Sequence, residues 1–318
     1  MRRRLAPGAA LARAVATACL LGLVACGSDG RTGAGSPTRA SSPAGSPAAT
    51  SGGSGSGSGP GQGAADPASG AEQALATVTA AYHRYVLGEA ASLRGQARRF
   101  TDAVRAGDLA LAKELYAPSR QSWERIEPIA NLVHELDGKL DGRVDDFAGP
   151  ADPKFTGWHR LEYLLWVTGS TTGAKPYADQ LDAGLATLQT RLRTVRVTAK
   201  AVALGAGELV EEVSKGKITG EEDRYSHTDL WDMGANISGA EAAMRVFVPA
   251  LNTKDPALLR AIQRDFAEVD RALLTYRTPS GAYKPFTALR PDDRTRLQAQ
   301  LAALSEELAK LPAALGVG

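Results

Sequence analysis

Residues 27–70 divide the chain, because they consist almost entirely of Gly, Ser, Ala, Pro and Thr. A stretch of this composition, such as the Ser/Gly run at 51–59, lacks the apolar side chains that a hydrophobic core requires. It is typical of a flexible tether, whose root-mean-square reach would be roughly 35 to 40 Å. We therefore expect the folded domain to be residues 71–318, near the upper size of a single core.

The residues before this tether have the pattern of an export signal. Basic residues at 2–4 precede an uncharged apolar stretch at 14–24, which is too short to span a bilayer comfortably. The apolar-apolar-small-Cys pattern that ends at Cys26 resembles a bacterial lipobox. We expect residues 1–25 to be a lipoprotein signal peptide, and a lipid on Cys26 to anchor the protein at the outer face of the cytoplasmic membrane. Export by the Sec or the Tat route stays open.

Cysteine usage and charge restrict the chemistry of the processed chain. The only cysteine besides Cys26 is Cys19, which lies inside the signal peptide. A metal would therefore be held by oxygen and nitrogen ligands. Without the four arginines of the signal peptide, 33 basic residues face 35 acidic ones, a net charge of −2. This balance does not predict binding to nucleic acid.

Residues 71–318 repeat apolar residues at helical spacing and show no alternating strand pattern, which predicts an all-α fold. Glycines, prolines and N-cap residues bound the expected helices, and residues 137–156 are expected to form a loop. Short connections favour one or two antiparallel bundles. The expected helices are 71–105, 108–116, one that starts at Pro118, 157–167, 177–213, 219–251, 256–276 and 291–311.

His159 and Glu162 are the first candidates for a metal site. They stand three residues apart on an expected helix, so the imidazole and the carboxylate share one face. This spacing alone arises often by chance. The helix is unusually apolar, however, and a charged Glu162 on its buried side needs compensation, which a cation supplies.

Glu124 and Glu127 repeat this three-residue spacing on another expected helix. A simpler interpretation is that Arg120 and Arg125 form weak surface ion pairs with them. Paired carboxylates on one helix, facing a His and a Glu on another, are nevertheless typical of metal sites inside helical bundles.

Acids outside these helices are weaker candidates. The loop 137–148 resembles a calcium loop but has Lys139 and Ala148 where ligands are needed, although one of its aspartates can still reach a site between the helices. Glu222 has the position of the acidic residue in a capping box that starts at Thr219, and this role competes with metal binding.

The motifs of common enzymes are missing from the sequence. Helical zinc proteases need a second histidine near the glutamate, but Tyr163 follows Glu162. The sequence has no nucleophile elbow, phosphate loop or dinucleotide fingerprint either. We therefore expect the protein not to be an enzyme.

Three segments, at 123–128, 155–162 and above all 220–232, closely resemble the EfeO/imelysin-like family, and the similarity covers about 77–313. The resemblance implies a pair of helical bundles with a cleft. It also implies a His-x-x-Glu metal motif with additional acidic ligands. The ligand set carried over by motif is His159, Glu162, Glu124, Glu127 and Asp141, and it is completed by Glu222 or Asp223.

The resemblance implies an extracytoplasmic iron-binding component of an EfeUOB-type uptake system. Such a component would deliver iron to an EfeU-type iron permease, alongside an EfeB-type haem peroxidase. Longer family members carry an N-terminal cupredoxin-like domain, where this sequence has the tether, so the valence of the iron stays open. Carboxylates with one imidazole also suit other divalent metals. There are two alternatives. The protein could be an imelysin-type metallopeptidase, or it could be a lipoprotein that binds a polysaccharide or a partner protein independently of metal.

Overall fold

The computed structural model describes the backbone of residues 67–318 and the side chains from Gln73 onward. The expected signal peptide, Cys26 and almost all of the tether lie outside the described residues. Within these residues the chain is helical, without a strand, and an isolated bridge joins Arg277 to Tyr283. The prediction of an all-α fold is confirmed. No helix in this part of the chain has the length and apolarity needed to cross a bilayer.

The α-helices follow one another with short connections, and short 3₁₀ helices, labelled η, lie between some of them. The elements are α1 (Pro67–Ala106), α2 (Leu109–Ile126), η1 (Glu127–Val133), α3 (His134–Leu140), η2 (Val144–Asp146), α4 (Gly157–Trp166), α5 (Lys175–Leu192), α6 (Ala199–Lys215), η3 (Lys217–Thr219), α7 (Asp229–Arg245), α8 (Val248–Lys254), α9 (Pro256–Leu274), η4 (Phe286–Ala288), α10 (Pro291–Leu308) and α11 (Leu311–Leu315).

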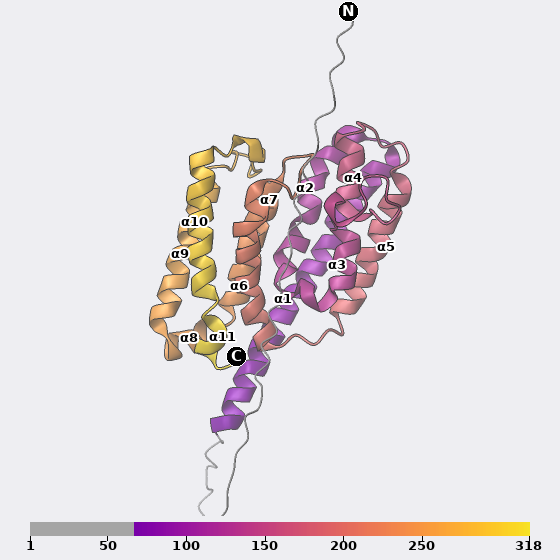
Figure 1. Cartoon of the computed structure of the whole chain (residues 1–318). Coiled ribbons are helices and arrows are strands. Elements are labelled where there is room, and N and C mark those ends of the chain that lie inside the picture. Colours follow the sequence, from indigo (N-terminus) through magenta and orange to yellow (C-terminus); the bar gives the residue numbers. More distant parts are fainter. Residues whose placement is uncertain (1–66) are drawn as a thin grey trace, which may run out of the picture. The chain divides into compact units, whose positions relative to one another are not determined.

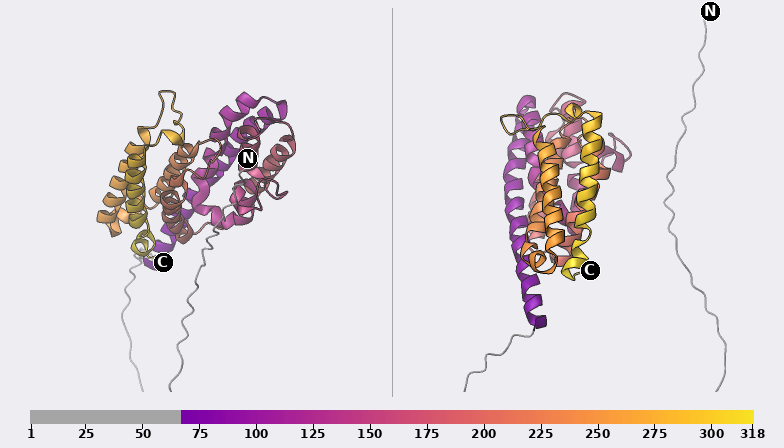
Figure 2. Two further views of the ribbon diagram at one scale, coloured as in Figure 1. Left: turned by 45° about the horizontal axis from the view of Figure 1, so that its top comes forward. Right: turned by 90° about the vertical axis from the view of Figure 1, so that its left-hand side faces the viewer.

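The long helices form two groups that lie side by side (Figure 1). Helices α1, α2, α4 and α5 pack together in the first group, and α6, α7, α9 and α10 in the second. Contacts between α2 and α7, and between α6 and η1, join the groups, and one continuous hydrophobic core runs through both. Helix α1 extends past the other helices at the end where the C-terminus lies (Figure 2). The junction of the two groups is where the candidate site lies.

Two aspartates cap helices as N-cap chemistry predicts. The Asp108 carboxylate accepts a hydrogen bond from the Leu111 amide at 3.0 Å, at the start of α2. The Asp255 carboxylate accepts one from the Leu258 amide at 2.9 Å, at the start of α9. Each satisfies an amide that has no partner within its own helix.

The predicted single helix over 177–213 is wrong, because α5 ends at Leu192 and α6 begins at Ala199. The connection is rich in β-branched residues, which lose side-chain freedom in a helix. Thr198 also favours a break, because its hydroxyl caps α6 by accepting a hydrogen bond from the Ala201 amide at 3.1 Å. The predicted final helix, 291–311, is similarly divided into α10 and α11.

Three further predictions are corrected, and the first two of them depended on proline and capping signals. Pro118 does not start a helix but lies inside α2, which packs against α1, α4 and α7 along its length. The predicted capping box at Thr219 is absent, because Gly220 adopts φ +81° and turns the chain, so that α7 starts only at Asp229. The predicted loop 137–156 includes the end of α3, and η2.

Two glycines let the groups approach closely at their junction. A Cβ atom on Gly205 of α6 would lie 1.8 Å from the Pro128 carbonyl oxygen, and one on Gly239 of α7 would lie 2.3 Å from the Arg125 carbonyl oxygen. Both carbonyls belong to the chain around the end of α2 and the start of η1. The glycines therefore fix the position of Glu124 and Glu127 relative to α6 and α7.

We expect Gly205→Ala to lower the free energy of unfolding by at least about 1–3 kcal/mol, because the methyl group would collide with backbone that has little room to move. Chemical denaturation of the metal-free protein measures this change. Gly95→Ala is the matched control: nothing lies within 4 Å of its added Cβ, so the better helix propensity of alanine should raise stability by about 0.5–1 kcal/mol. Equal effects of the two substitutions would contradict the packing argument.

Candidate metal centre

Charged side chains from six segments meet at the junction of the two helix groups, and we call this set the buried ionic cluster. Helix α2 supplies Arg120 and Glu124, one turn apart, and α4 supplies His159 and Glu162. The other segments are η1, the end of α3, the stretch from η3 through 223, and α7. The acids of the cluster are Glu124, Glu127, Asp141, Glu162, Glu222, Asp223, Asp229 and Asp232, and its cations are Arg120, His159 and Lys217.

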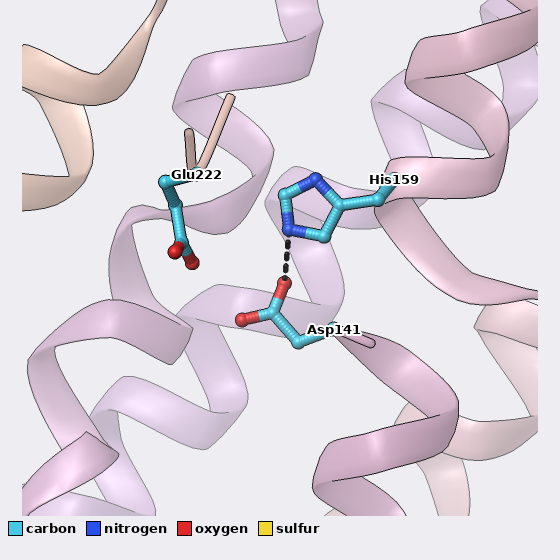
Figure 3. Close-up of side chains that lie close together, drawn as sticks. All are labelled: Asp141, His159 and Glu222. Atoms are coloured by element: carbon cyan, nitrogen blue, oxygen red, sulfur yellow. Dashed lines mark ion pairs between the residues drawn. The ribbon is translucent and has the colours of Figure 1, made fainter. Parts of the chain in front are cut away.

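The His159 ring is held between two carboxylates. Its Nδ1 lies 3.2 Å from Glu162 Oε2. Its Nε2 lies 3.4 Å from Asp141 Oδ1, and Figure 3 shows this second contact. Glu162 is fixed in turn, because its Oε1 accepts hydrogen bonds from the backbone amides of Tyr225 at 2.9 Å and Ser226 at 2.8 Å. The predicted shared face of His159 and Glu162 is thus present, and both side chains are buried.

Glu124 does not lie at the surface, as the ion-pair interpretation assumed, but is fully buried with Arg120. Its Oε1 accepts a hydrogen bond from Arg120 Nη2 at 2.6 Å, and its Oε2 accepts one from Lys217 Nζ at 2.7 Å. Glu127, which begins η1, also binds Lys217 Nζ, at 3.0 Å, and is largely covered. The two glutamates therefore share one buried ammonium.

Arg120 is the centre of the cluster. Its guanidinium contacts Asp141, lies 3.1 Å from Asp232 Oδ2 and 3.5 Å from Glu222 Oε1, and is fully buried. Glu222 is buried through these contacts rather than through helix capping.

The sequence interpretation missed the structural role of Arg120, and also missed Lys217, Asp229 and Asp232. Arg120 precedes Glu124 by four residues, and this spacing could have indicated that the two side chains form an ion pair. No neighbouring residue in the sequence indicated that Lys217 is buried.

Acids outnumber cations in the cluster, and this excess shifts their protonation. Burial and neighbouring carboxylates raise the pKa of Asp229 to about 7, and that of Asp232 well above its usual range. Burial raises the pKa of Glu127 in the same direction, as does the charge of Glu124. Buried Oδ2 of Asp229 and Oδ1 of Asp232 accept no hydrogen bond from any described residue. The metal-free cluster therefore retains protons, and it has unused acceptor oxygens that a cation can engage.

The pKa of His159 moves in the opposite sense to what burial alone would cause. Burial and the charge of Arg120 lower it, but the hydrogen bonds to Asp141 and Glu162 prevail and raise the pKa to about 10. Burial opposes ionisation of Asp141, yet Arg120 and His159 hold its pKa below the usual range. Without metal, His159 is thus an imidazolium that bridges two carboxylates.

This protonation predicts how stability depends on pH. A group whose pKa is about 10 when folded and near 6.5 when unfolded stabilises the fold fully below pH 6.5, and this contribution is lost as the pH rises to 10. Urea unfolding between pH 7 and 9, with a chelator present, should therefore show a loss from this group of about 1 kcal/mol per pH unit. In His159→Gln, the contribution of this group to the pH dependence of the free energy of unfolding should vanish. The same pH dependence in both proteins would contradict the raised pKa of His159.

The predicted metal ligands come together in four overlapping groups, in each of which one ligand atom per residue lies within 4.8 Å of the others. Every residue of the sequence-predicted set belongs to at least one group, although their role as ligands stays a prediction. The groups are Asp141 with His159 and Glu222; His159 with Glu162 and Asp223; Glu124 with Glu127 and Asp141; and Glu124 with Glu222 and Asp232.

A cavity of about 200 Å³ lies against one side of the cluster. Its lining includes Glu127, Asp141 and Glu222 of the cluster, and also Arg143, which pairs with Glu222 at 3.2 Å. The remaining charged groups of the lining are acidic: Asp137, Asp146, Glu208 and Glu212. This cavity gives the cluster an acidic approach that attracts cations and repels anions.

Most of the chain is similar to known proteins. The imelysin family model matches residues 78–311. The iron uptake system component EfeO of Yersinia pseudotuberculosis serotype I is 46% identical over 252 residues, which are 79% of this chain and 67% of the relative. The protein of the same name from Escherichia coli O157:H7 is 45% identical over 255 residues, which are 80% of this chain and 68% of the relative.

Proposed function

Because the chain belongs to the imelysin family and is closely similar to iron uptake components, we propose that it is the extracytoplasmic iron-binding component of an uptake system. The observation that supports this proposal most is the buried ionic cluster, in which acids outnumber cations and an imidazole stands among carboxylates. Iron would be the cargo of this site. Carboxylate and imidazole ligands form a donor set that iron accepts.

Binding would exchange protons for metal. The pKa values of Asp229, Asp232 and His159 are raised, so in the absence of metal the cluster holds protons against its excess of acids. A metal that binds these groups must displace protons, and its affinity therefore falls as the pH falls. A cargo protein needs such a reversible site, since the iron has to leave it again.

The cavity described above supplies the route by which iron would arrive. Its acids offer successive oxygen ligands, and it opens directly onto Glu127, Asp141 and Glu222. The contact between Arg143 and Glu222 stands at the boundary of the cavity and the cluster. A cation that reaches this boundary would compete with the half-exposed Arg143 for Glu222.

Titration of the chelator-stripped protein with ferrous and ferric iron, followed by calorimetry and metal analysis, tests the proposal. We expect saturable binding of iron, and much weaker binding when His159→Ala and Glu162→Ala are combined. Equal heats in the two proteins would refute the site. A peptide library incubated with the iron-loaded and zinc-loaded protein tests the alternative of a metallopeptidase, and we expect no metal-dependent cleavage.

We further propose that a lipid on Cys26 anchors the protein at the outer face of the cytoplasmic membrane, and that an EfeU-type permease receives the iron with an EfeB-type haem peroxidase as partner. The sequence pattern at the signal and the similarity to uptake components support this arrangement. Mass spectrometry of the membrane-extracted protein should find a diacylated N-terminal cysteine, and Cys26→Ala should release the protein from membranes. Crosslinking in cells that express the permease tests the delivery step.

A further inference from the structure

Three of the four ligand groups already contain a fixed cation. In the group of Asp141, His159 and Glu222, the Arg120 guanidinium contacts Asp141 and lies 3.3 Å from His159 Nε2. In the two groups that contain Glu124, this carboxylate is bound by both Arg120 and Lys217, at 2.6 and 2.7 Å. A metal at any of these positions would have to displace a buried Arg or Lys.

The fourth group is different, because the cations approach it least. It consists of His159 Nδ1, Glu162 Oε2 and Asp223 Oδ1. Arg120 contacts the Nε2 side of the His159 ring, but its nearest contact to one of these three ligand atoms is from Nε, at 3.8 Å from Asp223 Oδ1. A metal at these three atoms would not have to displace an arginine or a lysine side chain.

A phenol oxygen also faces this group. Tyr116, one helical turn before Arg120 on α2, donates a hydrogen bond to Asp223 Oδ1 at 2.9 Å, and its oxygen lies 3.4 Å from His159 Nδ1. His159 Nδ1 is 3.2 Å from Glu162 Oε2. For metal bonds of about 2.1 Å, neighbouring ligand atoms lie about 3.0 Å apart at right angles and about 3.4 Å apart in a tetrahedron. These three separations match neighbouring ligands of one coordination sphere, and the 3.9 Å between His159 Nδ1 and Asp223 Oδ1 corresponds to a wider angle at the metal.

The Tyr116 side chain is fixed in this position. It is fully buried, its ring packs edge-on against Phe100 and Trp166 with centroids 5.8 and 5.4 Å away, and the Arg120 guanidinium lies 6.0 Å from its centroid. Tyr116 needs little reorganisation to meet a cation at the fourth group.

We propose that Tyr116 is an iron ligand, which binds ferric iron as a phenolate together with His159 Nδ1, Glu162 and Asp223. This inference rests on the proposed function and specifies the cargo. Coordination forms the iron–oxygen bond and breaks the phenol O–H bond, and the proton leaves to solvent, as does the proton of His159. A phenolate is a hard, anionic oxygen ligand, and such a ligand favours the small trivalent ion over divalent competitors.

Electronic absorption of the ferric-loaded full chain tests this ligand directly, since ferric phenolates have a ligand-to-metal charge-transfer band in the visible region that carboxylates and imidazole do not produce. We expect the wild type to develop the band in proportion to bound iron, and Tyr116→Phe to bind ferric iron at least ten-fold more weakly and without the band. Tyr276→Phe is the matched control. The Tyr276 phenol donates to Asp293 Oδ2 at the same 2.9 Å, away from any histidine, so the band should persist.

Resonance Raman spectra of the wild type, excited in this band, give a second test that does not depend on the variant folding, because phenolate vibrations must appear. Iron bound without the band, or a band that persists in Tyr116→Phe, would overturn the role of Tyr116 and leave the proposed function standing. Failure of the wild type to bind either valence of iron would instead refute the proposed function itself.

Discussion

Replacing Arg120 with methionine should lower the free energy of unfolding of the metal-free protein by about 3–5 kcal/mol. Methionine keeps much of the side-chain length but removes the charge that Asp141 and Glu124 share. These carboxylates would then be buried without their main cation. The cost of a buried, uncompensated charge far exceeds the net gain that the intact ion pair provides. Urea unfolding in the presence of a chelator measures the difference.

Arg98→Met is the matched control for this substitution. Arg98 forms an ion pair with Asp102 at 3.5 Å on α1, with both side chains more than half exposed. Loss of such a pair should cost no more than about 1 kcal/mol. The loss in Arg120→Met should also shrink as the pH falls, because protonation of the stranded carboxylates removes their charge. Similar small losses in both variants, at all pH values, would show that Arg120 does not hold the cluster together.

The sequence predicted those parts of the site that depend on local spacing. His159 and Glu162 lie three apart on a helix that the apolar pattern of α4 correctly predicted, and their relative position follows from helix geometry. Asp141 and Asp223 were found by family motif instead, because their contacts depend on loops that end beside the helices. The all-α class followed from periodicity, since no strand pattern competed with it.

The cations of the cluster could not be predicted in this way. Arg120 meets Asp232, 112 residues further along the chain, and Lys217 meets Glu124 over 93 residues. From sequence alone, a charged side chain is predicted to be exposed, because burying an ion is costly unless partners distant in the sequence compensate its charge. Glu222 shows the same limitation, because a plausible local capping role was overridden when Gly220 turned the chain toward Arg120 and Lys217.

Glu162→Gln should weaken iron binding about 100-fold or more, given that loss of even a supporting group beside a metal ligand typically costs 10- to 100-fold. The substitution keeps the shape of the side chain, and its oxygen can still accept the amides of Tyr225 and Ser226. What changes is the atom that faces His159 Nδ1, where an amide nitrogen replaces a carboxylate oxygen. The variant should therefore remain folded but lose one ligand and one negative charge.

Competition titration against a chelator of known affinity measures this loss, and two further variants identify its cause. Glu221→Gln removes the same charge from an exposed side chain that pairs with Arg224, and should leave the affinity nearly unchanged. Glu127→Gln removes a carboxylate that belongs to a different ligand group, beside Lys217. A large effect of Glu162→Gln with a small effect of Glu127→Gln would place the iron on the Nδ1 side of His159. If Glu127→Gln had the larger effect, iron would bind at Glu127 and would have to displace Lys217. The cavity lined by Glu127 would then be the binding site itself, rather than the route by which iron reaches the site.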